Sequence, residues 1–334
     1  MRIGLIGAGA VASLHARAAR LLPDVELTAV CDLQPAVAAS VADPIGAQVF
    51  TDYRRLIDSA AVDAVIVNTP HGLHREMSIA AMRAGLHVLV EKPMATTVQD
   101  CDAMMSAAQQ HAVVLRVGHI QHFMPEKLAL AAAIEHGAIG PVRMVHDLRS
   151  TDYRPGTRSP WFFSPELAGG GVMMNIGVHC VDRVLWLGGA VGTTVSATML
   201  HRFGVGVDTD ATLRIRLAND VTASVTIVSD PPRKSDEITV VGDNGSVVTD
   251  TRKGTFLQHD GRTEVLHEAS DADIPEAFRL QLADFAAAVR GEDSAVSQEH
   301  SRHVIEVILG AYRSAANDGR PEPVGASTRA AAAQ

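Results

Sequence analysis

Short apolar runs alternate with alanine-rich segments through the first third of the chain. The runs consist almost entirely of Val, Ile, Leu and Ala, which is typical of parallel strands that helices cover on both faces. The segments between them repeat apolar residues at helical spacing, and this alternation predicts a doubly wound parallel sheet of the α/β class. The predicted strands span residues 2–6, 26–31, 47–50, 63–68, 87–90 and 113–117, and two of the helices span residues 73–84 and 98–111.

From about residue 141 the pattern changes to strands joined by short turns. Asn219-Asp220 and Asn244-Gly245 are turn pairs typical of hairpins, so we expect a mainly antiparallel sheet in an α+β domain. Its predicted strands span residues 142–149, 195–201, 211–217, 222–229, 237–241 and 246–249, followed by amphipathic helices over 276–290 and 300–316. We place the domains at 1–120 and 121–325, with the closing helices as candidates to pack back on the first domain and a frayed tail over 326–334.

The composition sets limits on compartment and partners. A chain of 334 residues with 47% hydrophobic and 20% charged residues is long enough for two domains and does not resemble a disordered sequence. Its formal net charge of −9 disfavours nucleic acid and anionic membrane surfaces as partners. The three widely spaced cysteines suggest no disulfide framework, and no stretch approaches the ~20 apolar residues of a membrane span, so we expect a cytoplasmic protein.

A glycine-rich turn directly follows the first predicted strand. In IGLIGAGAVASLH, Gly7 permits a tight turn, Gly9 leaves room for a pyrophosphate against the backbone, and Ala12 allows close helix packing. The helix that starts here points its positive end at the anion. This turn predicts dinucleotide binding, and the predicted contacts also include Ala10 and Val11.

Asp32 favours NAD over NADP as the dinucleotide. It lies 20 residues beyond Ala12, at the end of the second predicted strand. A carboxylate at this position binds the ribose diol and repels a 2′-phosphate. The residues that follow it, Leu33, Gln34 and Pro35, offer no cation for such a phosphate.

Two further segments follow the fourth and fifth strands. NTPHGLH spans residues 68–74, and EKP spans residues 91–93. Both lie at carboxyl ends of parallel strands, where open α/β sheets form their ligand crevice. A lysine that emerges from a buried strand at this edge is unusual, because most lysines are solvated surface residues. The residues expected to contact the cofactor here are Thr69, Pro70, His74, Glu91 and Lys92.

With these motifs, and with AGLHVLVEKPMA, GHIQHFMP and GGGVMMNIGVH, the chain from residue 2 to about 324 resembles the Gfo/Idh/MocA oxidoreductases, which include inositol and glucose–fructose oxidoreductases. The resemblance implies a Rossmann domain and an open-faced, mainly antiparallel sheet, with nicotinamide and substrate between them. That sheet often pairs subunits in the family, which implies a homodimer or homotetramer. The resemblance also implies that Lys92, often joined to Pro93 by a cis bond, contacts substrate and nicotinamide ribose, and that His179 exchanges a proton with the reacting hydroxyl.

The chemistry of these residues agrees with the implied roles. Oxidation of an alcohol with NAD removes a hydride from carbon and a proton from oxygen, and histidine accepts protons near neutral pH. The Lys92 cation favours an alkoxide-like transition state. Asn175 and His179 stand at i and i+4, so we expect them on one helix face, within reach of one substrate. Many relatives have aspartate in place of Asn175, whose amide orients a hydroxyl but cannot ionise, so proton transfer depends more on His179 and Lys92.

Other polar residues are candidates for substrate contacts. Gln121 and His122 stand where relatives often have Glu-Arg or Arg-Arg near the substrate. Arg158 lies in a loop rich in Pro, Gly and Arg, and suits a phosphate or carboxylate. No cysteine or carboxylate lies at a familiar ligand spacing from the histidines of these segments, so we expect no metal site. Those histidines are His71, His74, His119 and His122.

We therefore expect an NAD-dependent dehydrogenase or reductase that transfers a hydride between nicotinamide and a hydroxyl or keto carbon of a sugar, cyclitol or sugar derivative. Two alternatives remain open. One is a glycosidase that uses bound NAD for transient oxidation, which tightly held cofactor and no net NADH would reveal. The other is a regulator that binds dinucleotide without turnover, although the presence of both Lys92 and His179 argues against it.

Overall fold

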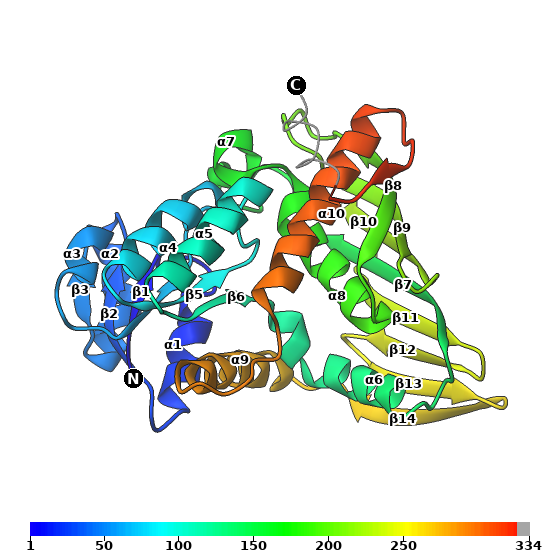
Figure 1. Cartoon of the computed structure of the whole chain (residues 1–334), viewed down its shortest axis with the longest axis horizontal. Coiled ribbons are helices and arrows are strands. Elements are labelled where there is room, and N and C mark those ends of the chain that lie inside the picture. Colours follow the sequence, from blue (N-terminus) through cyan, green and yellow to red (C-terminus); the bar gives the residue numbers. More distant parts are fainter. Residues whose placement is uncertain (326–334) are drawn as a thin grey trace. The chain divides into compact units, whose positions relative to one another are not determined.

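The computed structural model describes residues 1–325, which divide into two compact units (Figure 1). Unit 1 consists of residues 1–123 and 274–302, and unit 2 consists of residues 124–273 and the chain from residue 303 onward. The chain therefore returns to unit 1 after it has built most of unit 2. The expected tail over residues 326–334 lies outside the described residues.

A six-stranded parallel sheet forms the centre of unit 1, which confirms the predicted doubly wound fold. The strand order is β3-β2-β1-β4-β5-β6, so the order reverses between β1 and β4. The carboxyl ends of these two strands therefore mark the usual ligand crevice of such a sheet. The strands are β1 (Arg2–Ile6), β2 (Glu26–Cys31), β3 (Gln48–Phe50), β4 (Ala64–Val67), β5 (His87–Glu91) and β6 (Leu115–Gly118).

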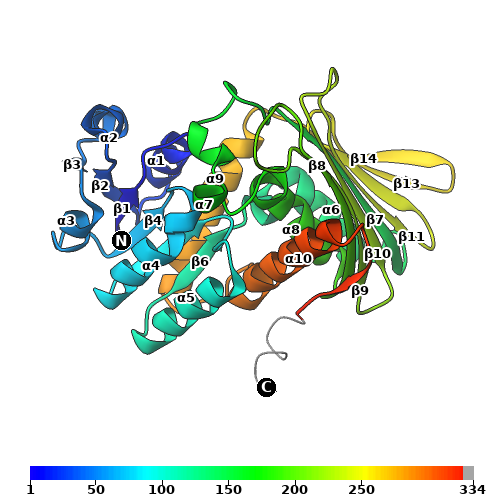
Figure 2. The same cartoon turned by 90° about the horizontal axis from the view of Figure 1, so that it is seen from above.

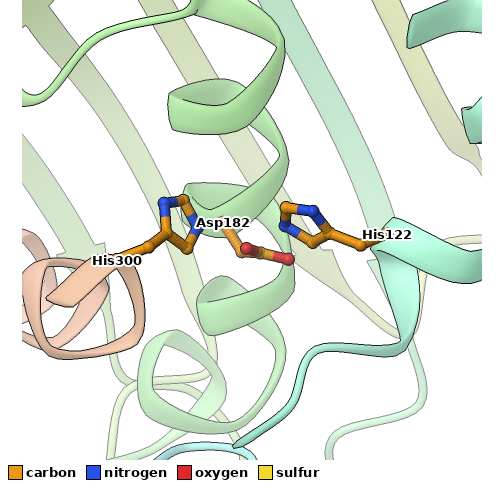
Figure 3. A group of neighbouring side chains, drawn as sticks. All are labelled: His122, Asp182 and His300. Carbon is orange, nitrogen blue, oxygen red and sulfur yellow. The ribbon is translucent and has the colours of Figure 1, made fainter. Parts of the chain in front are cut away.

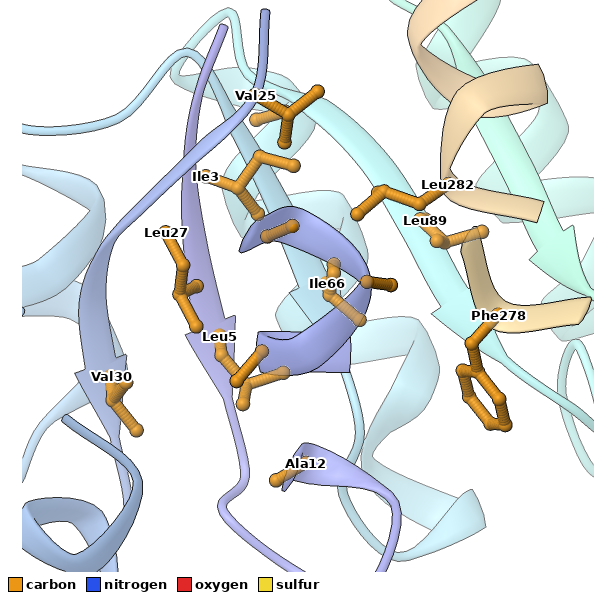
Figure 4. Close-up of a cluster of buried hydrophobic side chains, with 14 of the residues drawn as sticks. Ile3, Leu5, Ala12, Val25, Leu27, Val30, Ile66, Leu89, Phe278 and Leu282 are labelled. Carbon is orange, nitrogen blue, oxygen red and sulfur yellow. The ribbon is translucent and has the colours of Figure 1, made fainter. Parts of the chain in front are cut away.

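Helices cover both faces of this sheet. One face packs against α1, α2 and α9, in a core to which Leu5, Ile66 and Leu89 contribute from the strands and Phe278 and Leu282 from α9 (Figure 4). The late helix α9 thus completes a core that the first third of the chain begins. The helices of unit 1 are α1 (Ala12–Arg20), α2 (Pro35–Ala42), α3 (Tyr53–Ile57), α4 (His74–Arg83), α5 (Val98–Gln110) and most of α9 (Asp273–Val289).

A nine-stranded mixed sheet forms unit 2, in the order β14-β13-β12-β11-β7-β10-β9-β8-β15. Only β7 and β10 pair in parallel among these strands of the described chain, so the sheet is mainly antiparallel, as predicted. The strands are β7 (Val142–Thr151), β8 (Gly192–Leu200), β9 (Asp210–Leu217), β10 (Thr222–Ser229), β11 (Asp236–Gly242), β12 (Ser246–Asp250), β13 (Gly254–His259), β14 (Arg262–Glu268) and β15 (Glu322–Pro323).

Helices cover one face of this sheet and leave much of the other open (Figure 2). Helix α6 packs on β12, β13 and β14, and α8 packs on β7 and β10. The strands β9 and β10 alternate buried and more accessible positions, as a sheet with one solvated face requires. The helices of unit 2 are α6 (Pro125–Glu135), α7 (Pro165–Ala168), α8 (Val178–Gly188) and most of α10 (Gln298–Ala316). No helix within residues 1–325 has both the length and the apolar character needed to cross a bilayer.

Candidate functional site

The turn after β1 packs directly against the turn after β4. Gly7 has a φ of 96°, its N–H donates to the carbonyl of Cys31 at 2.8 Å, and its carbonyl accepts from Asn68 Nδ2 at 3.1 Å. A Cβ at this position would stand 2.3 Å from the carbonyl oxygen of Asn68. Both the backbone angle and the close approach therefore require glycine here.

The turn leaves the N-terminus of α1 accessible to an anion. Gly9 and Ala10 are exposed, and a Cβ at Gly9 would meet no atom within 4 Å. Val11 is the N-cap residue, and no side chain among residues 1–325 caps the helix there. Since the first N–H groups of a helix lack partners within it, an anion can bind them at this end. Buried Ala12 packs into the unit 1 core.

Asp32 holds its carboxylate at the carboxyl end of β2. Its Oδ2 accepts from the N–H of Ala8 at 3.0 Å, and its Oδ1 accepts from the N–H of Gln34 at 2.9 Å. These bonds fix the carboxylate beside the glycine-rich turn. The next residue, Leu33, is 88% exposed and brings no positive charge. The geometry therefore fits a ribose diol better than a 2′-phosphate.

The buried ring of His74 joins the loops that follow β4 and β5. Its Nδ1 lies 2.8 Å from the carbonyl oxygen of Pro93, and its Nε2 lies 3.0 Å from that of Thr69. Burial lowers the pKa of His74, although both carbonyls favour protonation. The Lys92–Pro93 bond, in the loop that follows β5, is cis. Because its ring is fully buried, His74 positions the loops that carry Thr69, Pro70 and Lys92.

A hydrogen-bonded pair that sequence reasoning missed fixes the residue before Lys92. His15 Nε2 lies 2.9 Å from Glu91 Oε1, and the His15 ring stands edge-on to Phe278. Burial raises the pKa of Glu91, but the His15 hydrogen bond and the nearby charges of His15 and Lys92 outweigh burial and lower that pKa overall. This pair ties α1 to the end of β5. The two residues lie 76 positions apart, so no local pattern links them.

Three imidazoles cluster after β6 in unit 1. Gln121 and His122 lie on the short helix η3 (Ile120–Phe123), and both are buried. The ring centroid of His122 lies 5.5 Å from that of His300 on α10 (Figure 3), and both rings lie within 6.3 Å of His119. The sequence predicted a substrate role for Gln121 and His122 but gave no indication that His300 joins them.

Asn175 and His179 lie on either side of a change in helix type. Residues Met173–Gly177 form a π-helical turn, and α8 follows. The helix is therefore not regular through this segment, and whether Asn175 and His179 share one face at i and i+4 stays a prediction. A Cβ at Gly177 would stand 2.4 Å from Met173 Cε, so this glycine makes room for the Met173 side chain. Such π-helical turns are frequent at functional sites. Both polar side chains are buried here.

Asp208 holds the glycine-rich segment before Asn175. Its Oδ1 accepts from the N–H of Gly171 and from the hydroxyl of Tyr312, each at 2.7 Å. Its Oδ2 accepts from the N–H of Met173 at 2.7 Å. A Cβ at Gly171 would stand 1.9 Å from the Asp208 carbonyl oxygen, which explains the glycine. Sequence reasoning missed Asp208 and Tyr312, because neither lies in a recognisable motif.

Arg183 anchors α8 to the sheet of unit 2. Its guanidinium donates to Asp147 on β7 at 2.8 Å and to Asp236 on β11 at 2.7 Å. Burial raises the pKa of Asp236, but the nearby cations, led by Arg149, lower it overall. Since His179 stands one helical turn before Arg183, this network fixes the helix that carries the imidazole.

Arg158 is engaged within its own loop. Its Nε donates to the carbonyl of Asp152 at 3.0 Å, and its Nη2 donates to the hydroxyl of Thr151 at 2.7 Å. The guanidinium also lies over the rings of Tyr153 and Phe162, and burial lowers its pKa. A substrate carboxylate would reach only the remaining N–H groups.

Unit 1 thus brings the predicted cofactor residues to one edge of its sheet, together with Lys92, Gln121 and His122. Unit 2 brings Asn175 and His179 together on one buried segment.

Two family models match these parts of the chain. One describes the NAD-binding Rossmann fold of an oxidoreductase family and matches residues 1–119, and the other describes that family's C-terminal domain and matches residues 128–248. The chain belongs to the Gfo/Idh/MocA oxidoreductase family. The resemblance seen in its motifs is thus confirmed.

Several relatives of this Gfo/Idh/MocA member have assigned activities. The 1-carboxy-3-chloro-3,4-dihydroxycyclohexa-1,5-diene dehydrogenase of Comamonas testosteroni is 33% identical over 71% of this chain, but the match spans only 60% of that relative. Inositol 2-dehydrogenase of Rhizobium meliloti is 27% identical over 95% of this chain and 97% of its own length. The solved structure of GenD2 from gentamicin A biosynthesis, in complex with NAD, has a TM-score of 0.87 at 25% identity and covers 98% of this chain and 97% of its own.

Proposed function

We propose that this Gfo/Idh/MocA member is an NAD-dependent dehydrogenase or reductase of a sugar, cyclitol or sugar derivative. The observation that carries the proposal is the open glycine turn at the uncapped N-terminus of α1, with the Asp32 carboxylate beside it. Two relatives support it: the full-length match to inositol 2-dehydrogenase and the NAD complex of GenD2.

The residues of unit 1 fit the cofactor. Gly7 and Gly9 give the pyrophosphate access to the helix N–H groups, and Asp32 receives the ribose hydroxyls. Thr69, Pro70 and Glu91 stand at the same sheet edge. When bound, NAD accepts a hydride from the substrate carbon.

The protein's own residues handle the proton and the charge. His179 accepts the hydroxyl proton as general base, and returns it when the reaction runs in the reductive direction. The Lys92 ammonium stabilises the negative charge that develops on the same oxygen. The Asn175 amide, which both donates and accepts hydrogen bonds, orients a neighbouring hydroxyl. Buried polar groups of this kind discriminate strongly against molecules that lack the matching hydroxyls.

The side chains assigned to substrate binding suit a neutral polyol. Gln121, His122 and Asn175 offer amide and imidazole groups, which match hydroxyls in both donor and acceptor roles. Arg158 is the candidate contact for an acidic substituent on the substrate ring. The name of the Comamonas testosteroni relative includes such a substituent, a carboxyl group. We therefore place cyclitols and sugars first, and carboxylated ring diols second.

The experiment is a screen for NADH formation by the purified full chain. It uses cyclitols, aldoses, anhydrosugars and carboxylated ring diols, each with NAD. We expect many turnovers per enzyme with at least one polyol. Bound NAD without reduction across the panel would favour the regulator, and glycoside cleavage without net NADH would favour the glycosidase. Either outcome contradicts the proposal.

The same assay tests the preference for NAD. The double change Asp32→Ser and Leu33→Arg removes the charge that repels a 2′-phosphate and adds one that attracts it. We expect the ratio of kcat/KM with NAD to kcat/KM with NADP to fall at least about tenfold. Leu33→Ser alone is the control, because this exposed side chain makes no polar contact, and its ratio should stay within about twofold. An unchanged ratio in the double variant would assign cofactor choice to other residues.

The open face of the unit 2 sheet supports a further part of the proposal, that copies of this chain pair as a homodimer or homotetramer. Met144 and Leu148 on β7 are 39% and 40% exposed. Around Met144 lie Ser, Thr, His and Arg side chains of β7 to β10. A solvated sheet face that exposes large apolar residues suits contact with a second copy.

A further inference from the structure

Three potential metal ligands come together inside unit 2 from segments far apart in the sequence. Glu126 lies in the first turn of α6, His267 near the end of β14, and Asp273 at the start of α9. One ligand atom of each lies within 4.8 Å of the other two, and His267 Nε2 lies 2.9 Å from Asp273 Oδ2. Atoms bound to one ion at its usual bond lengths stand about 3–3.5 Å apart. Small side-chain adjustments would therefore place all three on one cation.

Glu126 supplies an independent observation that points to a ligand. This side chain is 1% exposed, and its Oε1 accepts a hydrogen bond from Lys127 Nζ at 2.7 Å. Its Oε2 is buried and receives no hydrogen bond from residues 1–325. A buried carboxylate oxygen without a partner is costly, and in native proteins a water or an ion usually satisfies it.

The charges around the cluster are compatible with a cation. The Lys127 ammonium contacts Glu126 Oε1 and also donates to Thr251 Oγ1 at 2.8 Å. Glu126 Oε2 is therefore left for the ion. The N–H of Ser270 donates to Asp273 Oδ2 at 2.9 Å and holds that carboxylate in place.

We propose that Glu126, His267 and Asp273 bind a divalent transition cation of the Zn²⁺ type. One imidazole and two carboxylates form a mixed nitrogen and oxygen set that suits Zn²⁺, whereas Mg²⁺ and Ca²⁺ prefer oxygen ligands alone. The ion ties the start of α6 to the β13–β14 hairpin and to the turn before α9. Its role is structural, separate from the proposed hydride transfer. This proposal revises the expectation of no metal site. That expectation rested on the sequence spacing of other histidines, namely His71, His74, His119 and His122.

The test is calorimetric titration of the EDTA-treated full chain with Zn²⁺. We expect one tight equivalent, with Mg²⁺ binding at least about tenfold more weakly. His267→Asn and the double change Glu126→Gln and Asp273→Asn should each weaken Zn²⁺ binding at least about tenfold. The matched control changes the exposed pair His259→Asn and Asp260→Asn, which lies on the hairpin turn beyond the cluster, and should leave binding unchanged.

The variants also separate loss of the ligands from loss of the fold. His267 is half-buried, so His267→Asn should keep the wild-type circular dichroism spectrum even if the change at buried Glu126 destabilises the chain. Zn²⁺ should raise the melting temperature of the wild type and not that of His267→Asn. No tight equivalent in the wild type would mean that only water occupies the cluster. A tight equivalent that all of these variants retain would place the ion elsewhere. Either result overturns the proposal.

Discussion

His179→Ala is expected to lower kcat by at least about 100-fold while NADH affinity stays within about twofold. The imidazole acts on the substrate hydroxyl in the proposed mechanism, whereas the residues proposed to contact the cofactor lie in unit 1. Its helix is held by Arg183, Asp147 and Asp236, so removal of the imidazole should leave the backbone in place. Steady-state kinetics and NADH fluorescence titration measure the two quantities separately.

Lys92→Ala should produce a comparable loss of kcat through a different step. The change removes the charge that stabilises the developing alkoxide, while Glu91 and His74 still hold the loop. His136→Ala is the matched control, because this exposed histidine at the end of α6 belongs to neither candidate site. If His179→Ala and Lys92→Ala both kept the wild-type kcat, the catalytic assignment would be wrong. If His136→Ala lost as much activity as His179→Ala, the effect would not be specific.

Gly9→Ala is expected to separate cofactor binding from stability. The new Cβ meets no protein atom within 4 Å, so the free energy of unfolding should change by no more than about 1 kcal/mol. The same Cβ would stand where the pyrophosphate approaches the backbone, so the Kd for NADH should rise at least about tenfold. Denaturant unfolding and fluorescence titration give the two values.

Gly7→Ala, in contrast to Gly9→Ala, should lower the free energy of unfolding. Its Cβ would stand 2.3 Å from the Asn68 carbonyl oxygen at a φ of 96°, so we expect a loss of about 3 kcal/mol or more in the free energy of unfolding. Gly206→Ala is the control, since no atom lies within 4 Å of its added Cβ and the residue lies in unit 2. A normal NADH affinity in Gly9→Ala would show that the pyrophosphate does not approach this turn.

Much of the fold follows from local pattern. The six strands of unit 1 are near-continuous apolar runs, and each predicted strand has its counterpart in the parallel sheet. In unit 2 the prediction missed β13, β14 and β15. Strand β14 is mostly exposed, so it shows no apolar period, and β15 has only two residues. Such strands owe their pairing to neighbours in the sheet rather than to their own sequence.

The candidate site also contains residues that the sequence predicts and residues that it does not. Gly7, Gly9 and Asp32 could be predicted because each stands at a fixed sequence distance from the end of a strand. Dinucleotide-binding sheets form their ligand contacts at these positions. His15, His300 and Asp208 could not, because each meets its partner only through folding. The π-helical turn before α8 could not be predicted either, because the hydrophobic pattern was read with the regular spacing of an α-helix.

The measurement that tests most directly whether Lys92 and His179 share one reaction is a crystal structure of the full chain with NADH and a competitive polyol inhibitor. We predict that Lys92 Nζ and a ring nitrogen of His179 both lie within about 3.5 Å of one inhibitor hydroxyl, next to the nicotinamide ring. Side chains that point into separate cavities, or a pyrophosphate bound away from Gly9, would contradict the proposed mechanism.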